Sequence, residues 1–277
     1  VNVSSEFIIK KNHLNNKETN HPLFERCLAD SFDQIIYQSV FVSSEYWILN
    51  EHKVAGAFVV PGTAYLEMIT EILVRHYPGF IYRFNDVVFI NPISLNYGVA
   101  VEVHSVIKNE YDGIKFKIAS RLVGENKWMI HVEGRIDLLV NKHESSLDID
   151  NIKKTHYEGR LKYYEYKQGK GIETGPRWDC IKKTYIGNEG VLVYLCLNEK
   201  YLEEINQYNL HPALLDEAVN VALRSVGEDL YLPFSYKNMV ISDRLPGKVY
   251  SYIKRNDTGK ENEEFASFNI TIKIGRA

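Results

Sequence analysis

The chain has 277 residues, of which 45% are hydrophobic and 25% charged, and its formal net charge is −3. This length and composition allow a folded core of one large domain or two fused smaller ones and argue against disorder. The near-neutral balance excludes a broad basic surface, so nucleic acids and anionic membranes are poor candidates as main partners. No apolar run reaches the roughly 20 residues that cross a bilayer, and Val1 to Asn20 has no signal-peptide core. We therefore expect an unexported, cytoplasmic protein.

The three cysteines, Cys27, Cys180 and Cys196, are widely separated along the chain. An odd number without paired spacing matches neither a disulfide framework nor a zinc-ligand pattern. The sequence therefore predicts a reducing compartment and no metal site. Because it begins at Val1 and stops at Ala277, we expect a segment of a longer polypeptide.

The first half of the chain is rich in β-type sequence, with one helical segment. Alternating apolar and polar residues, punctuated by turn signals such as Asp112-Gly113, predict antiparallel strands. These strands are predicted over residues 37–42, 82–90, 100–107, 114–122 and 128–139. Apolar residues at helical spacing predict a helix from Pro61 to about His76, with the proline in its first turn.

A polar stretch from Asn141 to about Lys154 interrupts this pattern, which then returns in the second half. The second half is predicted to hold strands over residues 178–186 and 190–197, a helix from His211 to Val226, and strands near Met239, Val249 and Phe268. Each half is thus one long helix against a sheet. We interpret this as an α+β double hot-dog, with a sandwich as the alternative. Its parts are an N-terminal hot-dog (1–142), a linker (143–156) and a C-terminal hot-dog (157–277).

His52 is the first candidate catalytic residue. It lies directly before the first predicted helix, where a loop side chain can enter a cleft, and Gly56 and Pro61 are expected to shape the loop. Histidine exchanges protons near neutral pH, so an apolar loop that keeps it uncharged makes it a suitable general base. Any one of nine histidines taken alone more often satisfies backbone groups, so His52 gains weight only together with a second group.

Asp216 is that second group. It lies within the first turns of the second predicted helix, and Asn220, four residues later, shares its helical face. An aspartate on the apolar side of a helix must be paired, hydrogen-bonded or kept protonated, which makes it a candidate general acid. The amide of Asn220 is placed to orient the carboxylate. The alternative is a charge that interacts with the helix dipole.

These motifs together resemble the dehydratase domains of modular polyketide synthases. The signatures of that family are His-x3-Gly-x4-Pro in the first hot-dog and Asp followed by Gln or His four residues later in the second. His52, Gly56 and Pro61 match the first signature in full. Further similar blocks are His21-Pro22-Leu23, Pro61 to Met68, Gly175-Pro176-Arg177-Trp178, His211 to Asp216 and Leu232-Pro233-Phe234-Ser235. Ordered blocks over residues 20 to 245 are far more specific than one motif.

The resemblance implies a substrate carried on the phosphopantetheine arm of an acyl carrier protein, which enters a tunnel between the halves. It implies no metal and no soluble cofactor. Neighbouring synthase domains are implied as partners, and a homodimer is an expectation of the family. Thr174, Gly175, Pro176 and Val60 are expected to line the tunnel.

The resemblance also implies a reaction. His52 would remove a proton from the α-carbon of a β-hydroxyacyl thioester while Asp216 protonates the departing hydroxyl, giving an α,β-unsaturated thioester. The developing enolate oxygen needs hydrogen-bond donors, and the backbone N–H near Gly56, at the helix start, is the expected one.

Two positions depart from the family pattern. Asn220 stands where glutamine or histidine is usual, and one methylene less moves its amide by roughly 1.5 Å. The Tyr-Gly-Pro motif of the family is Thr174-Gly175-Pro176 here, so a phenol that usually lines the site is missing at that position. Tyr163, Tyr164 and Tyr166 are candidate replacements.

These departures leave other activities open. Asn220 is similar to the residue of pyran synthases, dehydratase-like enzymes in which His52 would deprotonate a hydroxyl that adds to an enoyl thioester, while Asp216 holds or delivers a proton. The retained Gly56 and Pro61 favour dehydration. Double-bond isomerases usually lack the aspartate, so Asp216 counts against that activity. A catalytically silent docking domain is disfavoured because His52 and Asp216 are both present.

Basic groups on the predicted surface have two interpretations. They are Lys153-Lys154, Lys162 and Lys182-Lys183. Most such groups are solvated faces, and the alternative is electrostatic steering of an acidic carrier protein.

Overall fold

Strands make up most of the regular structure in the computed structural model, which describes residues 19–140, 147–159, 171–221, 232–256 and 266–274. The strands are β1 (Arg26–Asp30), β2 (Gln34–Val42), β3 (His52–Val54), β4 (Ala57–Val59), β5 (Ile81–Phe89), β6 (Ser94–Leu95), β7 (Ala100–Glu110), β8 (Gly113–Leu122), β9 (Met129–Leu139), β10 (Tyr157–Gly159), β11 (Ile172–Thr174), β12 (Ile181–Ile186), β13 (Val191–Cys196), β14 (Ser235–Ile241), β15 (Lys248–Arg255) and β16 (Phe268–Ile274). The helices are α1 (Trp47–Asn50), α2 (Gly62–His76), α3 (Ile149–Thr155) and α4 (Pro212–Asn220), with 3-10 helices η1 (Pro176–Trp178) and η2 (Glu199–Gln207).

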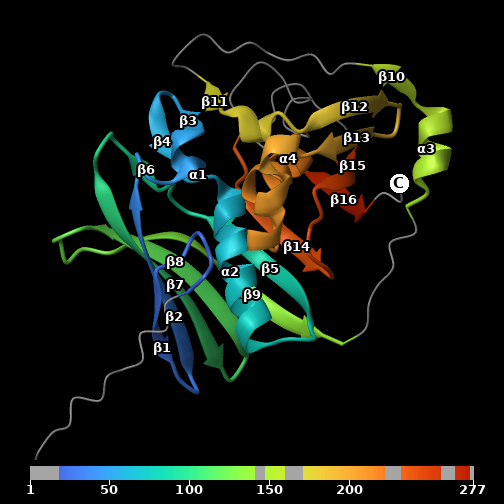
Figure 1. Cartoon of the computed structure of the whole chain (residues 1–277). Helices are drawn as coiled ribbons and strands as arrows, with labels where there is room; N and C mark the ends of the chain where they lie inside the picture. Colours follow the sequence, from blue (N-terminus) through green and yellow to red (C-terminus); the bar gives the residue numbers. More distant parts are fainter. Residues whose placement is uncertain (1–18, 141–146, 160–170, 222–231, 257–265, 275–277) are drawn as a thin grey trace, which may run out of the picture.

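Helix α2 runs through the middle of the molecule (Figure 1). Every residue from Thr63 to Leu73 is buried, so the helix is covered on all sides, as expected for one wrapped by sheet. Pro61 precedes the first helical residue in an extended conformation, because its fixed φ suits the entry to a helix. The predicted helix is confirmed, with Pro61 at its N-cap.

A seven-stranded antiparallel sheet curves around α2, in the order β1-β2-β7-β8-β9-β5-β14 (Figure 1). Alternation explains which side chains face the helix: Val101 and Val103 of β7 are buried, whereas the residues between and beside them are less so. The strands predicted for the first half are confirmed, with ends that differ by a few residues.

A second sheet, in the order β10-β12-β13-β15-β16, packs against α4, and the Ser251 hydroxyl on β15 donates to the Ala218 carbonyl of α4 at 2.6 Å. Helices α2 and α4 contact each other, and Figure 1 shows them side by side. Two helices, each against its own antiparallel sheet, form the predicted α+β double hot-dog. The strands predicted near Met239, Val249 and Phe268 are confirmed as β14, β15 and β16.

Strand pairs join the two halves of the chain. Strand β14 pairs with β5, from Ser235 opposite Val88 to Ile241 opposite Tyr82, and thereby extends the sheet of the first half. Strand β11 pairs with β3. The division at 143–156 stays a prediction, and that range contains helix α3, where the Asp148 side chain caps the N–H of Asn151 at 3.0 Å.

Two boundaries predicted in the second half differ in outcome: the start of one strand is wrong, and the end of the helix falls outside the described residues. The strand predicted from Trp178 begins at Ile181, because Pro176 starts a 3-10 turn that carries Trp178 inward. Helix α4 ends at Asn220, and Val226, the predicted end, lies outside the described residues.

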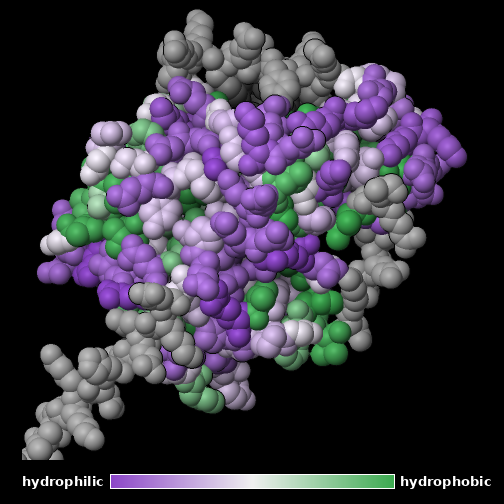
Figure 2. Space-filling view, in the orientation of Figure 1, coloured by the Kyte–Doolittle hydropathy of each residue, from purple (hydrophilic) through white to green (hydrophobic). Residues whose placement is uncertain are grey.

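The surface is mainly hydrophilic in the space-filling view (Figure 2). Apolar side chains gather at the left of that view, over β6 and the adjoining ends of β7 and β8. Leu122 and Val123, at the end of β8, are exposed. Among the described helices, none combines the length and apolar character needed to span a bilayer.

A buried carboxylate links α2 to the segment that precedes α4. The Glu67 side chain is fully buried and accepts hydrogen bonds from His21 Nε2 and from the backbone N–H of Asn209, both at 2.9 Å, and from the N–H of Leu210. Burying a carboxylate is costly unless such donors replace water. Glu67 therefore fixes the position of the Asn209 and Leu210 backbone relative to α2.

Replacing Glu67 with glutamine should destabilise the fold. The side-chain NH2 of Glu67→Gln would face N–H donors, so we expect a loss of about 3 kcal/mol in the free energy of unfolding, typical for a broken buried network. Urea denaturation followed by circular dichroism measures this. Glu125→Gln, at an exposed position, is the matched control. Equal stability of both variants would refute the role given to Glu67.

Candidate active site

His52 begins β3, and its side chain is buried. Its Nδ1 lies 2.7 Å from the backbone carbonyl of Val59 on the neighbouring strand. A carbonyl only accepts, so Nδ1 carries the hydrogen and the neutral ring keeps its lone pair on Nε2. His52 is therefore oriented to take up a proton through Nε2.

Gly56 shapes the hairpin that carries His52. Val54 pairs with Ala57, so Ala55 and Gly56 form a two-residue turn with φ angles of 50° and 83°. Such turns need positive φ at both positions, which glycine adopts without strain. The expectation that the Gly56 N–H lies at a helix start is wrong, because this turn and β4 separate it from the first residue of α2.

Asp216 is buried on α4 and accepts hydrogen bonds on both carboxylate oxygens. The indole Nε1 of Trp178 donates to Oδ2 at 2.9 Å, and the amide of Asn220 donates to Oδ1 at 2.8 Å. The Thr63 hydroxyl, at the start of α2, lies 3.5 Å from Oδ1 and donates to the carbonyl of Pro212 at 3.0 Å. The carboxylate is thus oriented by its own helix and by a separate segment.

Trp178 contacts both candidate catalytic residues. Its ring stacks on the imidazole of His52, with centroids 5.5 Å apart and planes inclined by 27°, while its N–H reaches Asp216. The structure therefore brings His52 and Asp216, 164 positions apart in the sequence, to two sides of one indole. Sequence reasoning gave Trp178 no role, although the block Gly175-Pro176-Arg177-Trp178 contains it.

An ion-pair cluster holds the segment that carries Trp178. The Arg177 guanidinium pairs with Glu51, the neighbour of His52, and with both carboxylate oxygens of Glu204. Burial opposes its charge, but the hydrogen bonds and charges of these two carboxylates raise the pKa of Arg177. The Gly175 N–H donates to the Glu51 carbonyl at 2.8 Å, and a Cβ on Gly175 would overlap the Glu51 side chain. Only glycine allows this approach.

The residues predicted to line a tunnel lie close to the site in different ways. Thr174 is paired opposite His52 in the β11–β3 ladder, and Pro176 is the first residue of η1, with both side chains exposed. Val60 is buried, and its N–H donates to the Ile93 carbonyl at 3.0 Å. Their contact with a substrate stays a prediction. Tyr163, Tyr164, Tyr166 and Lys162 lie outside the described residues.

Tyr236 is a phenol near Asp216 that sequence reasoning missed. It lies on β14, and its ring packs edge-on against Phe89 with centroids 5.6 Å apart. Burial, with the Asp216 charge as a second cause, raises the pKa of Tyr236. The phenol therefore stays protonated and able to donate near the site. The Leu232-Pro233-Phe234-Ser235 block directly before it was the available signal.

One group of possible metal ligands is described, formed by His21, Glu67 and Glu71, with one donor atom each within 4.8 Å of the others. These donors are engaged in the protein: Glu67 as described above, and Glu71 by Asn209 Nδ2 at 2.6 Å and by Arg75. The group is therefore accounted for as a structural network. The absence of a cofactor stays a prediction.

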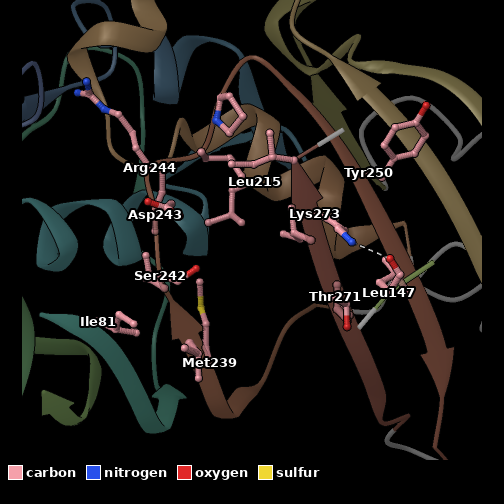
Figure 3. A pocket seen from close by; sticks show the side chains of 18 of the residues that line it. Ile81, Leu147, Leu215, Met239, Ser242, Asp243, Arg244, Tyr250, Thr271 and Lys273 are labelled. Carbon is pink, nitrogen blue, oxygen red and sulfur yellow. Dashed lines mark hydrogen bonds between the residues drawn. The ribbon is translucent and has the colours of Figure 1, made fainter. Parts of the chain in front are cut away.

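A cavity of about 1180 Å³ lies between the edge strands β14 and β16 (Figure 3). Its lining includes Leu215 and Met239, as well as Lys273, whose Nζ donates to the Leu147 carbonyl at 2.8 Å. Neither His52 nor Asp216 is among its lining residues. This cavity is thus distinct from the candidate active site.

Comparisons with known proteins identify relatives of both halves. Residues 21–121 match the family model of the polyketide synthase dehydratase domain, and residues 155–276 match that of the polyketide synthase dehydratase N-terminal domain. The chain is 26% identical over 274 residues to polyketide synthase PksM of Bacillus subtilis (strain 168). That alignment covers 91% of this chain but 6% of PksM, so the chain spans a small part of that relative.

Solved structures confirm the fold. The dehydratase domain from the CurF module of curacin polyketide synthase superimposes with a TM-score of 0.78 at 22% identity, covering 91% of this chain and 93% of the other. An inactive CurK dehydratase mutant, with a histidine replaced by phenylalanine, gives 0.76 at 23% identity and 90% coverage of both chains. A second inactive CurK mutant, with an aspartate replaced by asparagine, gives 0.74 at 23% identity, covering 84% and 86%.

The histidine that caps α4 makes the site region sensitive to acid. Burial lowers the pKa of His211 to about 4, although Glu204 acts in the opposite direction, and its ring stacks on Trp47. Well above pH 6.5 the His211 imidazole is uncharged in both the folded and the unfolded chain. As the pH falls below 6.5, His211 becomes protonated in the unfolded chain but stays uncharged in the folded chain, so the free energy of unfolding falls until about pH 4.

We expect this group to remove up to about 3 kcal/mol of unfolding free energy across that window, at about 1.36 kcal/mol for each pH unit. Urea denaturation at a series of pH values measures it. In His211→Asn, which keeps an N-cap acceptor, the acid side of the stability profile should be flatter. An unchanged acid dependence in that variant would contradict the assignment.

Proposed function

Because the chain belongs to the dehydratase-domain family of polyketide synthases, we propose that it removes water from a β-hydroxyacyl thioester and releases an α,β-unsaturated thioester. The observation that carries the proposal is the placement of a candidate base, His52, and a candidate acid, Asp216, against one buried indole. The acyl chain would arrive on the phosphopantetheine arm of an acyl carrier protein, with neighbouring synthase domains as the other partners.

His52 would act as the base. With Nδ1 bonded to the Val59 carbonyl, Nε2 accepts the α-proton, which the thioester carbonyl makes acidic. The Val59 carbonyl, which accepts from Nδ1, stabilises the imidazolium that forms. The stacked ring of Trp178 offers its electron-rich face to that charge. The electron pair of the broken C–H bond becomes the new double bond.

Asp216 would act as the acid. Its protonated carboxyl gives the proton to the β-hydroxyl as the C–O bond breaks, so the leaving group departs as water. The donors Trp178 and Asn220 then stabilise the carboxylate that remains. Each turnover leaves His52 protonated and Asp216 ionised, and a proton must return from the first to the second before the next.

The relatives support this assignment of roles. Inactive mutants of the CurK dehydratase replace one histidine or one aspartate, the two residue types that meet at the indole here. The phosphopantetheine arm brings the reactive group with it, so the proposal requires no soluble cofactor.

Formation of an oxygen heterocycle is the second candidate. The observation that favours it is Asn220, which donates to Asp216 where the family usually has a longer side chain. In that reaction His52 takes the proton of a distal hydroxyl, whose oxygen adds to the β-carbon of an enoyl thioester, and the α-carbon then gains a proton from Asp216, which His52 later restores. Gly56 and Pro61, both retained, favour dehydration.

One experiment distinguishes these activities. A β-hydroxyacyl thioester with a distal hydroxyl, and its enoyl counterpart, are incubated with the protein and followed by mass and by retention against a synthetic cyclic standard. We expect the linear enoyl product from the first substrate and no cyclic product from the second. Since acid–base groups each contribute about 10²- to 10⁴-fold, His52→Ala and Asp216→Asn should lower the rate by at least about 10²-fold.

His104→Ala, on β7, and Asp179→Asn, at an exposed position, are the matched controls and should keep the unaltered rate. Cyclisation of the enoyl thioester would replace dehydration by the second candidate. Absence of both reactions, or full activity in His52→Ala, would refute the proposed function.

A further inference from the structure

We infer that Trp178 is a positioning residue that holds the base and the acid in one fixed arrangement; its catalytic meaning rests on the proposed function. The residue is 3% exposed, and its two contacts use different parts of the indole. The ring face lies on His52 and the N–H points at Asp216. An indole has a single donor and no acceptor, so this donor has one orientation relative to the ring.

The backbone around Trp178 is held on both sides. The backbone N–H of Trp178 donates to the Gly175 carbonyl at 3.0 Å, and the backbone carbonyl of Trp178 accepts from the Cys180 N–H at 2.7 Å. The ring also packs at 66° against Trp47, with centroids 5.7 Å apart. Trp178 is thus a rigid element, and not a side chain that adapts to its neighbours.

The Arg177 cluster connects this rigid element to the base. Arg177 pairs with Glu51, the residue directly before His52, and its backbone N–H also donates to the Glu51 carboxylate at 3.1 Å. Through this cluster the segment that carries the indole is fixed to the start of β3. Movement of Trp178 would therefore require movement of the strand that carries His52.

Trp178 and Asn220 donate to Asp216 from different elements. Asn220 belongs to α4, as Asp216 does, so this hydrogen bond moves with the helix. The Trp178 bond instead reaches Asp216 from the segment that is fixed to His52. It is therefore a contact that relates the acid to the base directly, and misplacement of catalytic groups by about 1 Å can cost about 10²-fold in rate.

Nuclear magnetic resonance tests the contact without turnover. The chain has three tryptophans, so 15N-indole labelling gives three N–H signals, which Trp→Phe variants assign. We expect the Trp178 signal to move upfield in Asp216→Ala, because this substitution removes the acceptor of the indole N–H. The indole of Trp128, the partly exposed tryptophan, is the internal control. An unchanged Trp178 signal in Asp216→Ala would overturn the contact.

Kinetics tests the positioning role. Trp178→Phe keeps a stacking ring and loses the donor, so we expect kcat to fall by about tenfold to about 100-fold with KM little changed. In the Asp216→Asn background the same substitution should cost little more, because the two residues act as a unit. Trp128→Phe, on the partly exposed tryptophan, should keep the unaltered rate.

The outcomes separate the inference from the proposed function. Equal kcat in Trp178→Phe and the unaltered protein, or an equal loss in both backgrounds, would refute the positioning role. A loss matched by a lower melting temperature and by a rise in KM would assign Trp178 to folding and also refute it. Absence of dehydration by the unaltered protein would instead refute the proposed function itself.

Discussion

The Glu67 carboxylate, fully buried in the middle of α2, is the interaction on which the arrangement of the site depends. A buried carboxyl group needs hydrogen-bond partners in place of water, and two of its donors are backbone N–H groups just before α4. The start of α4, and with it Asp216, is thereby fixed relative to α2. His21 ties an earlier segment of the chain to the same carboxylate.

A second constraint brings the base to the acid. Strand β11 pairs with β3, Arg177 pairs with Glu51, and the turn at Gly175 approaches Glu51 more closely than any side chain would allow. These contacts place Trp178 between the strand that carries His52 and the helix that carries Asp216. The chemistry proposed for this family member thus depends on contacts between halves that are remote in sequence.

Sequence patterns predicted the features that depend on neighbouring residues in the chain, such as helix spacing. The spacing of apolar residues predicted α2. The match of His52 and Asp216 to a family pattern predicted a catalytic pair, and Trp178 contacts both residues, while their catalytic roles stay a prediction. The Gly56 N–H was expected at the start of the helix, whereas it lies in the turn between β3 and β4. A glycine indicates that the chain bends but does not indicate which strands the bend connects. The inward course of Trp178 depends on Glu51 and Arg177, and the pairing of β14 with β5 depends on tertiary contact, so neither has a local signal.

The most direct test of the account is a crystal structure of the protein with a stable amide analogue of a β-hydroxyacyl pantetheine thioester. The account predicts the α-carbon next to Nε2 of His52 and the β-hydroxyl within hydrogen-bond distance of Asp216, with the Trp178 indole still bonded to that carboxylate. An acyl chain bound instead in the cavity between β14 and β16, whose lining includes neither residue, would contradict it.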